Sequence, residues 1–465
     1  MRLYKLLKNY SKKNIVAMHM PGHKRRGFTF SRIPYKLDIT EIDGFDNLHC
    51  PTGILKSCQE KASKLFKSNQ SFYLVNGSTC GILASIKTCC DFGDKIIMPK
   101  NCHKSVYHAV ELLNLKCVFI PTHTDKNNIF KDILLDDLKV LINENQDAKC
   151  VLITSPTYEG VISDIKNISQ LVHEYNIPLI VDEAHGSHLF LENKSAVNND
   201  ADIVINSLHK TLPSLTQTAI LHILSNRIDL NKLQHNLSIF MSSSPSYILM
   251  SSIDECVEYL NKKGRKSYLK LTKNLKWFKK ECEKLQNLQI LNNSKSDFFD
   301  LDLTKIVILT NNTNITGAQL LNFLREQKIE LEMAYTNYAL AYATIFDNKK
   351  SFKKLFNALK KIDKKILSQN NFVVLQNFET KSKLTVYEAL SCKNEIINFE
   401  KCQNKTCAEY VWIYPPGIPI LIPGQVITQD IYKYIEYAVK CGLEIKSSKK
   451  MLPDKINVIK DLTKN

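Results

Sequence analysis

The chain of 465 residues has no long apolar run, and no stretch approaches the roughly 20 apolar residues that a membrane-spanning helix needs. Its basic first residues are not followed by an apolar core and a small-residue cleavage site, so we expect no secretory signal peptide. Hydrophobic residues make up 44% and charged residues 23%, which excludes a disordered tail protein, a fibre and a disulfide-stapled miniprotein. We expect a cytoplasmic protein of about three structural units with no membrane partner.

Arginine is scarce although the formal net charge is +17, because only seven of the 63 basic residues are Arg. The lysines are scattered through Lys/Asn-rich stretches such as 261–281, whereas a nucleic-acid binder clusters its cations and uses Arg for bidentate contacts. We therefore expect no nucleic-acid partner. The fourteen Cys form no CxxC pair, and Cys402 and Cys407 have no His nearby, so we expect no metal site and free thiols in a reducing cytoplasm.

Residues 70–225 alternate short β-branched runs with segments whose apolar residues recur every three to four positions. Repeated strand–helix–strand units predict an α/β fold with a mostly parallel sheet and helices on both faces. Ligands of such sheets collect at the carboxyl ends of the strands. The predicted strands are 71-SFYLV, 95-KIIMP, 116-KCVFI, 149-KCVLITS, 177-IPLIVDEA and 202-DIVINS. Predicted helices cover 80–90, 103–114, 134–144, 164–176, 249–284 and 428–441, and a further strand starts at 305.

Two of these strand ends carry residues suited to an aldehyde cofactor. Lys210 follows the last predicted strand, and a desolvated lysine can form a Schiff base; the alternative is an exposed loop lysine. In 178-PLIVDEAHGSH, Asp182 directly follows four apolar residues at the predicted end of a strand. It either caps the next element or keeps a pyridine nitrogen protonated. Ala184 offers a small surface for one ring face, and His185 either binds the cofactor or fills the loop.

Two strand-to-helix junctions complete the set. In 75-VNGSTCGILASIKT, Ser78 and Thr79 open a helix whose free N–H groups suit a phosphate, or they are ordinary N-cap residues. Neither a Walker motif nor GxGxxG is present. His103 opens the helix of 99-PKNCHKSVYHAVELL, either as a helix-start residue or as an imidazole stacked on a cofactor ring.

At these residues the chain resembles the pyridoxal-phosphate-dependent ornithine/lysine/arginine decarboxylases of bacteria in their short form. The likeness runs from about residue 4 to 445 and is weak between about 260 and 385. Its motifs are 19-HMPGHK, 38-DITEIDGFDNLH, 76-NGST, 101-NCHKSV, 154-TSPTYEGVISDI, 181-VDEAHGSH, 207-SLHKTLPSLTQ, 242-SSSPSYILMSSID and 414-YPPGIPILIPGQ.

The resemblance implies a large domain of the aspartate-aminotransferase type, fold type I, followed by smaller α/β C-terminal domains. Expected boundaries are an N-terminal segment 1–50, a cofactor-binding domain 51–265, a small domain 266–375 and a C-terminal domain 376–465. Lys210 would bind pyridoxal 5'-phosphate covalently, Asp182 would pair with the pyridine nitrogen, and His103 would stack on the ring opposite Ala184. The phosphate ligands would be Ser78, Thr79, Ser207, His209 and, from the partner subunit of a homodimer, a serine such as Ser242 or Ser243.

The implied reaction is α-decarboxylation of a basic L-amino acid to CO2 and a polyamine or diamine precursor, with arginine or lysine preferred and ornithine possible. His103 or Lys210 would return a proton to Cα. Acidic residues of the N-terminal segment are candidates for binding the distal cation of the substrate, or they form a solvated loop: Glu41, Asp43 and Asp46. Gln425 stands where relatives commonly carry Glu, and Glu159 where they often carry Tyr or Asp, so both positions bear on substrate choice.

Two other functions fit the same pattern. An aminotransferase of this fold usually clamps the substrate carboxylate with a C-terminal Arg, but Arg227, Arg265 and Arg325 lie in no motif of that kind. A catalytically inactive regulatory paralogue usually loses the lysine or the aspartate, and this chain has both Lys210 and Asp182. Decarboxylation is therefore the favoured prediction.

Overall fold

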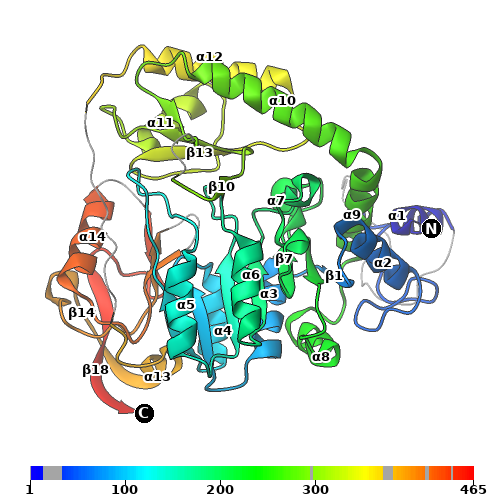
Figure 1. Cartoon of the computed structure of the whole chain (residues 1–465), viewed down its shortest axis with the longest axis horizontal. Helices are drawn as coiled ribbons and strands as arrows, with labels where there is room; N and C mark the ends of the chain where they lie inside the picture. Colours follow the sequence, from blue (N-terminus) through cyan, green and yellow to red (C-terminus); the bar gives the residue numbers. More distant parts are fainter. Residues whose placement is uncertain are drawn as a thin grey trace. The chain divides into compact units, whose positions relative to one another are not determined.

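A computed structural model describes residues 2–13, 34–293, 297–369, 381–413, 418–440 and 444–464. The motif 19-HMPGHK and residues 414–417 of the last motif lie outside the described residues. The chain divides into two compact units, one of residues 1–89 and 178–268 and the other of residues 90–177 and 269–465. Figure 1 traces the elements along the chain, with the first unit in blue and green.

The first unit contains four strands in the order β1-β8-β7-β6. β6 and β7 are parallel, whereas β8 is antiparallel to both β7 and β1. Its elements are α1 (Leu3–Ser11), α2 (Ile54–Phe66), β1 (Gln70–Leu74), α3 (Gly77–Cys89), β6 (Leu179–Asp182), β7 (Ile203–Asn206), α7 (Leu208–Thr211), β8 (Ala219–Ile223), α8 (Leu230–Phe240) and α9 (Tyr247–Tyr259). Short 3-10 turns cover Leu189–Glu192 and Ala196–Asn198.

The second unit begins with three parallel strands in the order β4-β2-β3. The elements of this region are β2 (Lys95–Pro99), α4 (Lys104–Leu112), β3 (Lys116–Ile120), α5 (Leu135–Glu144), β4 (Cys150–Thr154), the short β5 (Val161–Ile162) outside this sheet, and α6 (Ile165–Glu174). The predicted strands and helices of this region are thus present, and the mostly parallel α/β class is confirmed. β8 is a strand that the sequence analysis did not predict.

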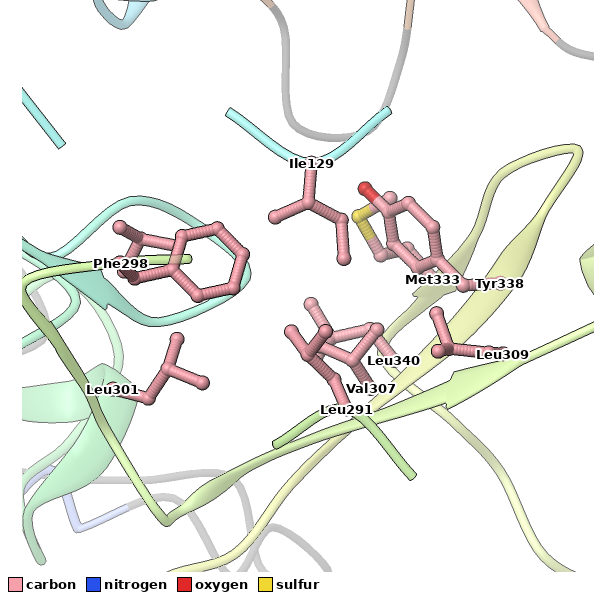
Figure 2. Packing of buried hydrophobic residues seen from close by; sticks show 10 residues of the cluster. Ile129, Leu291, Phe298, Leu301, Val307, Leu309, Met333, Tyr338 and Leu340 are labelled. Carbon is pink, nitrogen blue, oxygen red and sulfur yellow. The ribbon is translucent and has the colours of Figure 1, made fainter. Parts of the chain in front are cut away.

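A four-stranded antiparallel sheet, β12-β13-β11-β9, follows in the second unit. This part of the chain contains β9 (Gln289–Ile290), β10 (Asp300–Leu301), β11 (Lys305–Leu309), α11 (Gly317–Glu326), β12 (Met333–Ala334), β13 (Tyr338–Tyr342) and α12 (Lys349–Asp363). β10 pairs antiparallel with β5 and does not belong to the four-stranded sheet. Figure 2 shows the core of this part, where side chains of the sheet converge on Ile129 and Phe298 from neighbouring loops. Burial of these side chains stabilises the sheet by removing apolar surface from water.

The C-terminal part has its own core, built from residues such as Phe399, Val411, Ile431 and Val458. Its elements are α13 (Val386–Ser391), β14 (Cys392–Asn398), a 3-10 turn (Phe399–Lys401), β15 (Val411–Ile413), β16 (Ile418–Leu421), α14 (Gln429–Lys440), β17 (Ile445–Ser447) and β18 (Lys455–Lys464). The predicted helix over 428–441 is therefore confirmed as α14.

The predicted long helix over 249–284 consists of α9, a π-helical turn over Leu260–Gly264 and α10 (Arg265–Cys282). A π turn shifts the register of the side chains that follow it, which a single 3.6-residue period does not describe. Among the described residues, no helix is both long and apolar enough to cross a membrane.

Candidate active site

Asp182 is the last residue of β6 and is only 3% exposed. The strand Leu179–Asp182 is buried throughout, so the carboxylate stands at the end of an apolar run. Burial raises the pKa of Asp182, and the nearby Lys210 ammonium opposes this effect. The Ala184 amide donates a hydrogen bond to Oδ1 at 3.1 Å. A buried carboxylate held in this way is suited to bind a cationic or N–H-bearing group of a ligand.

Lys210 lies in the one-turn helix α7, directly after β7. Its side chain is half-buried, and Nζ is 2.9 Å from Nε2 of His185. His185 follows β6 and Lys210 follows β7. Because these two strands are parallel neighbours, their carboxyl ends bring the imidazole and the amine into contact. The sequence analysis listed His185 beside the cofactor but did not pair it with Lys210, because residues 25 positions apart meet only through strand pairing.

Two buried hydroxyls beside Lys210 have no hydrogen-bond partner among the described residues, Ser207 Oγ and Thr211 Oγ1. Leaving a buried hydroxyl unpaired costs about 1–3 kcal/mol, so these atoms are suited to a polar ligand such as a phosphate oxygen. Thr211 was not a sequence candidate. His209 has its Nδ1 2.9 Å from the Thr218 carbonyl, and burial lowers the pKa of His209. A backbone carbonyl only accepts, so Nδ1 carries the proton and Nε2 is free to accept.

The turn before α3 has the features of an anion site. Gly77 has a φ of +75°, which favours glycine, and its N–H donates to the Gln217 carbonyl at 2.9 Å. Ser78 and Thr79 are half-buried in the first turn of α3, which contains no acidic residue. The N–H groups of this helix start therefore present a partial positive charge without a competing carboxylate.

Ser242 and Ser243 are exposed. The Ser242 amide donates to Asn76 Oδ1 at 3.2 Å, and the Ser242 carbonyl lies 2.8 Å from His49 Nε2. Asn76 immediately precedes Gly77, so Ser242 belongs to the surroundings of the same turn within one chain.

The loop after β6 is fixed by Glu183, which is 1% exposed. Its carboxylate accepts hydrogen bonds from Ser195 Oγ at 2.6 Å, the Ala196 amide at 2.7 Å and Asn206 Nδ2 at 2.9 Å. Burial raises the pKa of Glu183 to about 7, and these three donors oppose the shift. The sequence analysis did not single out Glu183, since its partners lie 12 or more positions away.

The three acidic candidates of the N-terminal segment differ in their surroundings. Asp43 is exposed, and Glu41 has a buried Oε1 with no hydrogen-bond partner among the described residues. The Asp46 carboxylate accepts hydrogen bonds at the start of α2, from Thr52 N at 2.9 Å, Gly53 N at 2.7 Å and Leu55 N at 3.0 Å. Burial alone would raise the pKa of Asp46, but these backbone donors lower it below its usual value. Asp46 thus caps a helix.

His103, in the second unit, is the N-cap residue of α4, and its Nδ1 accepts a hydrogen bond from the Ser105 amide at 3.2 Å. The ring is half-buried. The helix-start arrangement that the sequence analysis considered is therefore present.

Glu159 and Gln425, the two positions that the sequence analysis connected with substrate choice, are both buried in the second unit. Glu159 accepts a hydrogen bond from Tyr338 OH at 2.6 Å, and burial raises the pKa of Glu159. Gln425 accepts a hydrogen bond from the Ile422 amide at 3.1 Å and so closes the turn after β16. Both side chains have structural partners.

Comparison with known proteins agrees with this geometry. Family models match residues 2–302, described as "Orn/Lys/Arg decarboxylase, major domain", and residues 365–445, described as "Orn/Lys/Arg decarboxylase, C-terminal domain". The chain belongs to the Orn/Lys/Arg decarboxylase family. It is 31% identical to the arginine decarboxylase of Bacillus anthracis, covering 99% of this chain and 97% of that protein. An arginine decarboxylase of Bacillus subtilis is also 31% identical, covering 99% and 98%.

A solved lysine decarboxylase of Francisella novicida, LdcF, has the same fold, with a TM-score of 0.83 at 19% identity over 98% of this chain and 81% of that one. Fold type I is confirmed. Membership of the decarboxylase family also confirms pyridoxal phosphate as the cofactor. Buried Asp182, unpaired Ser207 Oγ and Thr211 Oγ1, and the Gly77 turn fit the ring nitrogen and the phosphate of this cofactor.

Proposed function

We propose that this decarboxylase removes the α-carboxyl group of L-arginine. The observation that supports the substrate is the 31% identity, over nearly the whole chain, to proteins named arginine decarboxylase. Lysine is the second candidate, because Lysine decarboxylase LdcA of Pseudomonas aeruginosa is 18% identical over 54% of this chain. The likeness to solved lysine decarboxylases supports the fold and not the substrate.

The residues of the first unit have distinct roles in this proposal. The amine of Lys210 would hold the cofactor covalently, and the Asp182 carboxylate would hold a proton on its ring nitrogen. Ser78, Thr79, Ser207 and His209 would bind the phosphate, together with the Thr211 hydroxyl, which has no hydrogen-bond partner among the described residues. Ala184 would contact the ring. When bound, pyridoxal phosphate supplies an aldehyde carbon for the amino group and a ring that accepts the electrons of the breaking Cα–carboxylate bond.

Other residues take part in binding and proton transfer. His103 would contact the cofactor ring, and His103 or Lys210 would supply the proton that Cα takes up in place of the carboxyl group. Glu41, with its unpaired buried oxygen, is the best placed of the acidic candidates to bind the distal cation of the substrate. Asp46 is engaged in capping α2, and Asp43 is exposed. The active enzyme is a homodimer in which Ser242 or Ser243 contacts the phosphate of the partner subunit's cofactor.

The experiment is CO2 release from the purified protein with pyridoxal phosphate, offered L-arginine, L-lysine and L-ornithine separately. We expect release from arginine at a kcat/KM at least tenfold above that for the other two. Greater release from lysine would overturn the substrate. No release from any of them, with the cofactor's visible absorbance present, would instead favour transamination or a regulatory role.

A further inference from the structure

Lys210 lies near a carboxylate that favours its positive charge. The Asp182 carboxylate attracts the Lys210 ammonium, and this attraction opposes the effect of burial on the pKa of Asp182. His209 directly precedes Lys210 on α7; burial lowers the pKa of His209, and the positive charge of Lys210 lowers it further. An ammonium has no lone pair and cannot attack a carbonyl carbon. Lys210 therefore needs a base before it can bond to an aldehyde.

The lysine nitrogen is in contact with His185. The 2.9 Å between Lys210 Nζ and His185 Nε2 is a hydrogen-bonding distance, within the range required of a general base. Nε2 accepts this bond when the imidazole is neutral and carries its proton on Nδ1. A neutral imidazole is the side chain that most often serves as a general base in enzymes.

The loop that carries His185 is attached to the segment that carries Lys210. Ser187 Oγ donates to the Ser207 carbonyl at 2.8 Å, and Asn206 Nδ2 donates to the Glu183 carboxylate at 2.9 Å. The Gly186 amide donates to the Glu183 carbonyl at 2.9 Å, which closes a tight turn around His185. Glu183, Ser187, Asn206 and Ser207 are all buried. These bonds fix the distance between the base and the amine, as proton transfer requires.

We propose that His185 is the base that deprotonates Lys210 before Lys210 bonds to the aldehyde carbon of the cofactor. This inference rests on the proposed function and adds a role for His185 beyond contact with the cofactor. The Lys210 ammonium gives one proton to His185 Nε2. The resulting amine forms a C=N bond to the aldehyde carbon, and the carbonyl oxygen leaves as water with the two remaining amine protons. His185 then releases its proton to solvent.

The test measures the rate at which cofactor-free enzyme binds pyridoxal phosphate through Lys210. Stopped-flow visible absorbance monitors this rate at pH values between 6 and 11. We expect His185→Gln to slow capture about a hundredfold near pH 7, the usual contribution of a general base. The difference between the variant and the wild type should shrink as the pH rises, because hydroxide then removes the proton that His185 accepts near pH 7. His185→Asn is measured in the same way, so that the test does not depend on the folding of one variant.

The matched control is His235→Gln, because His235 is an exposed residue of α8. Its capture rate should follow the wild type at every pH. An equal slowing of both His185 variants at all pH values would show a structural effect and overturn the base role, as would no slowing at all. Lys210→Ala gives the absorbance of the cofactor without a bond to this lysine. If the wild-type protein shows the same absorbance as Lys210→Ala, the proposed function itself fails.

Discussion

Asp182 and Lys210 are two buried or half-buried charged groups whose charges support each other. Burying a charge is costly, and a protein retains such a group where it has a partner or a ligand. Asp182 has one backbone donor and the nearby lysine, which leaves capacity for the ring nitrogen of the cofactor. The proposed chemistry of the site therefore depends on the charges of these two side chains.

Replacing Asp182 by Asn should retain cofactor binding but lower kcat by about a hundredfold or more, because an amide does not stabilise a protonated ring. Visible absorbance and CO2 release measure the two effects. Asp200→Asn is the matched control, because Asp200 is exposed and its φ of +61° is tolerated by Asn. A kcat near the wild-type value for Asp182→Asn would contradict the role.

Lys210→Ala should abolish both CO2 release and the lysine-dependent visible absorbance, because no other amine occupies this position. Retained turnover would refute the assignment of Lys210. Lys194→Ala is a suitable comparison, since Lys194 lies in the same unit and pairs with Glu192 on the 3-10 turn.

His222 in β8 should make folding stability fall in acid. It is 0% exposed, its Nδ1 is 2.8 Å from Ser71 Oγ, and burial lowers the pKa of His222 to about 3. Because the folded pKa lies below the ordinary 6.5, its contribution is complete above pH 6.5 and is lost as the pH falls toward 3, by on the order of 4 kcal/mol. Urea unfolding at several pH values should show a shallower acid dependence for His222→Gln. An unchanged dependence would contradict this account, and His235→Gln serves as the control.

Asp46 shows how an element depends on one side chain. Asp46 has a φ of +71°, and its carboxylate binds the free N–H groups where α2 begins. Anions at a helix N-terminus are stabilising, and capping bonds are worth about 0.5–2 kcal/mol. The acidic N-terminal segment, whose residues were predicted to bind the substrate, thus contains one residue, Asp46, that caps α2.

Asp46→Ala should lower the free energy of unfolding by about 1–2 kcal/mol, because several backbone donors lose their acceptor. Asp46→Asn, which keeps one side-chain oxygen, should cost less. Denaturant unfolding measures both variants. A raised KM for the basic amino acid with unchanged stability would instead make Asp46 a substrate ligand, so KM is determined alongside.

The elements themselves were largely predictable, because hydrophobic periodicity depends on local burial. All strands predicted between 70 and 225 are present, with ends within a few residues. β8 and the direction of β1 were not predictable. β8 is buried at every position, and the antiparallel pairing of β8 with β1 and β7 depends on tertiary contacts. A fully buried run has the same composition in either direction.

At the scale of the whole molecule, the proposed homodimer predicts a mass of twice 53.3 kDa in solution. Light scattering coupled to size-exclusion chromatography measures it at the concentration used for the activity assay. A fully active monomer would contradict the shared site that assigns Ser242 or Ser243 to the partner's phosphate. The boundaries at residues 50, 265 and 375 also stay predictions.

The sequence by itself determined the family, the cofactor and the residue types at the strand ends, because the motifs around Asp182 and Lys210 are local and specific. Only the tertiary structure decided which of these residues meet. The contact of His185 with Lys210, the unpaired hydroxyl of Ser207 and the capping role of Asp46 all depend on strand pairing and burial. Hydrogen bonds between distant positions arise when the chain packs, so local patterns do not contain them.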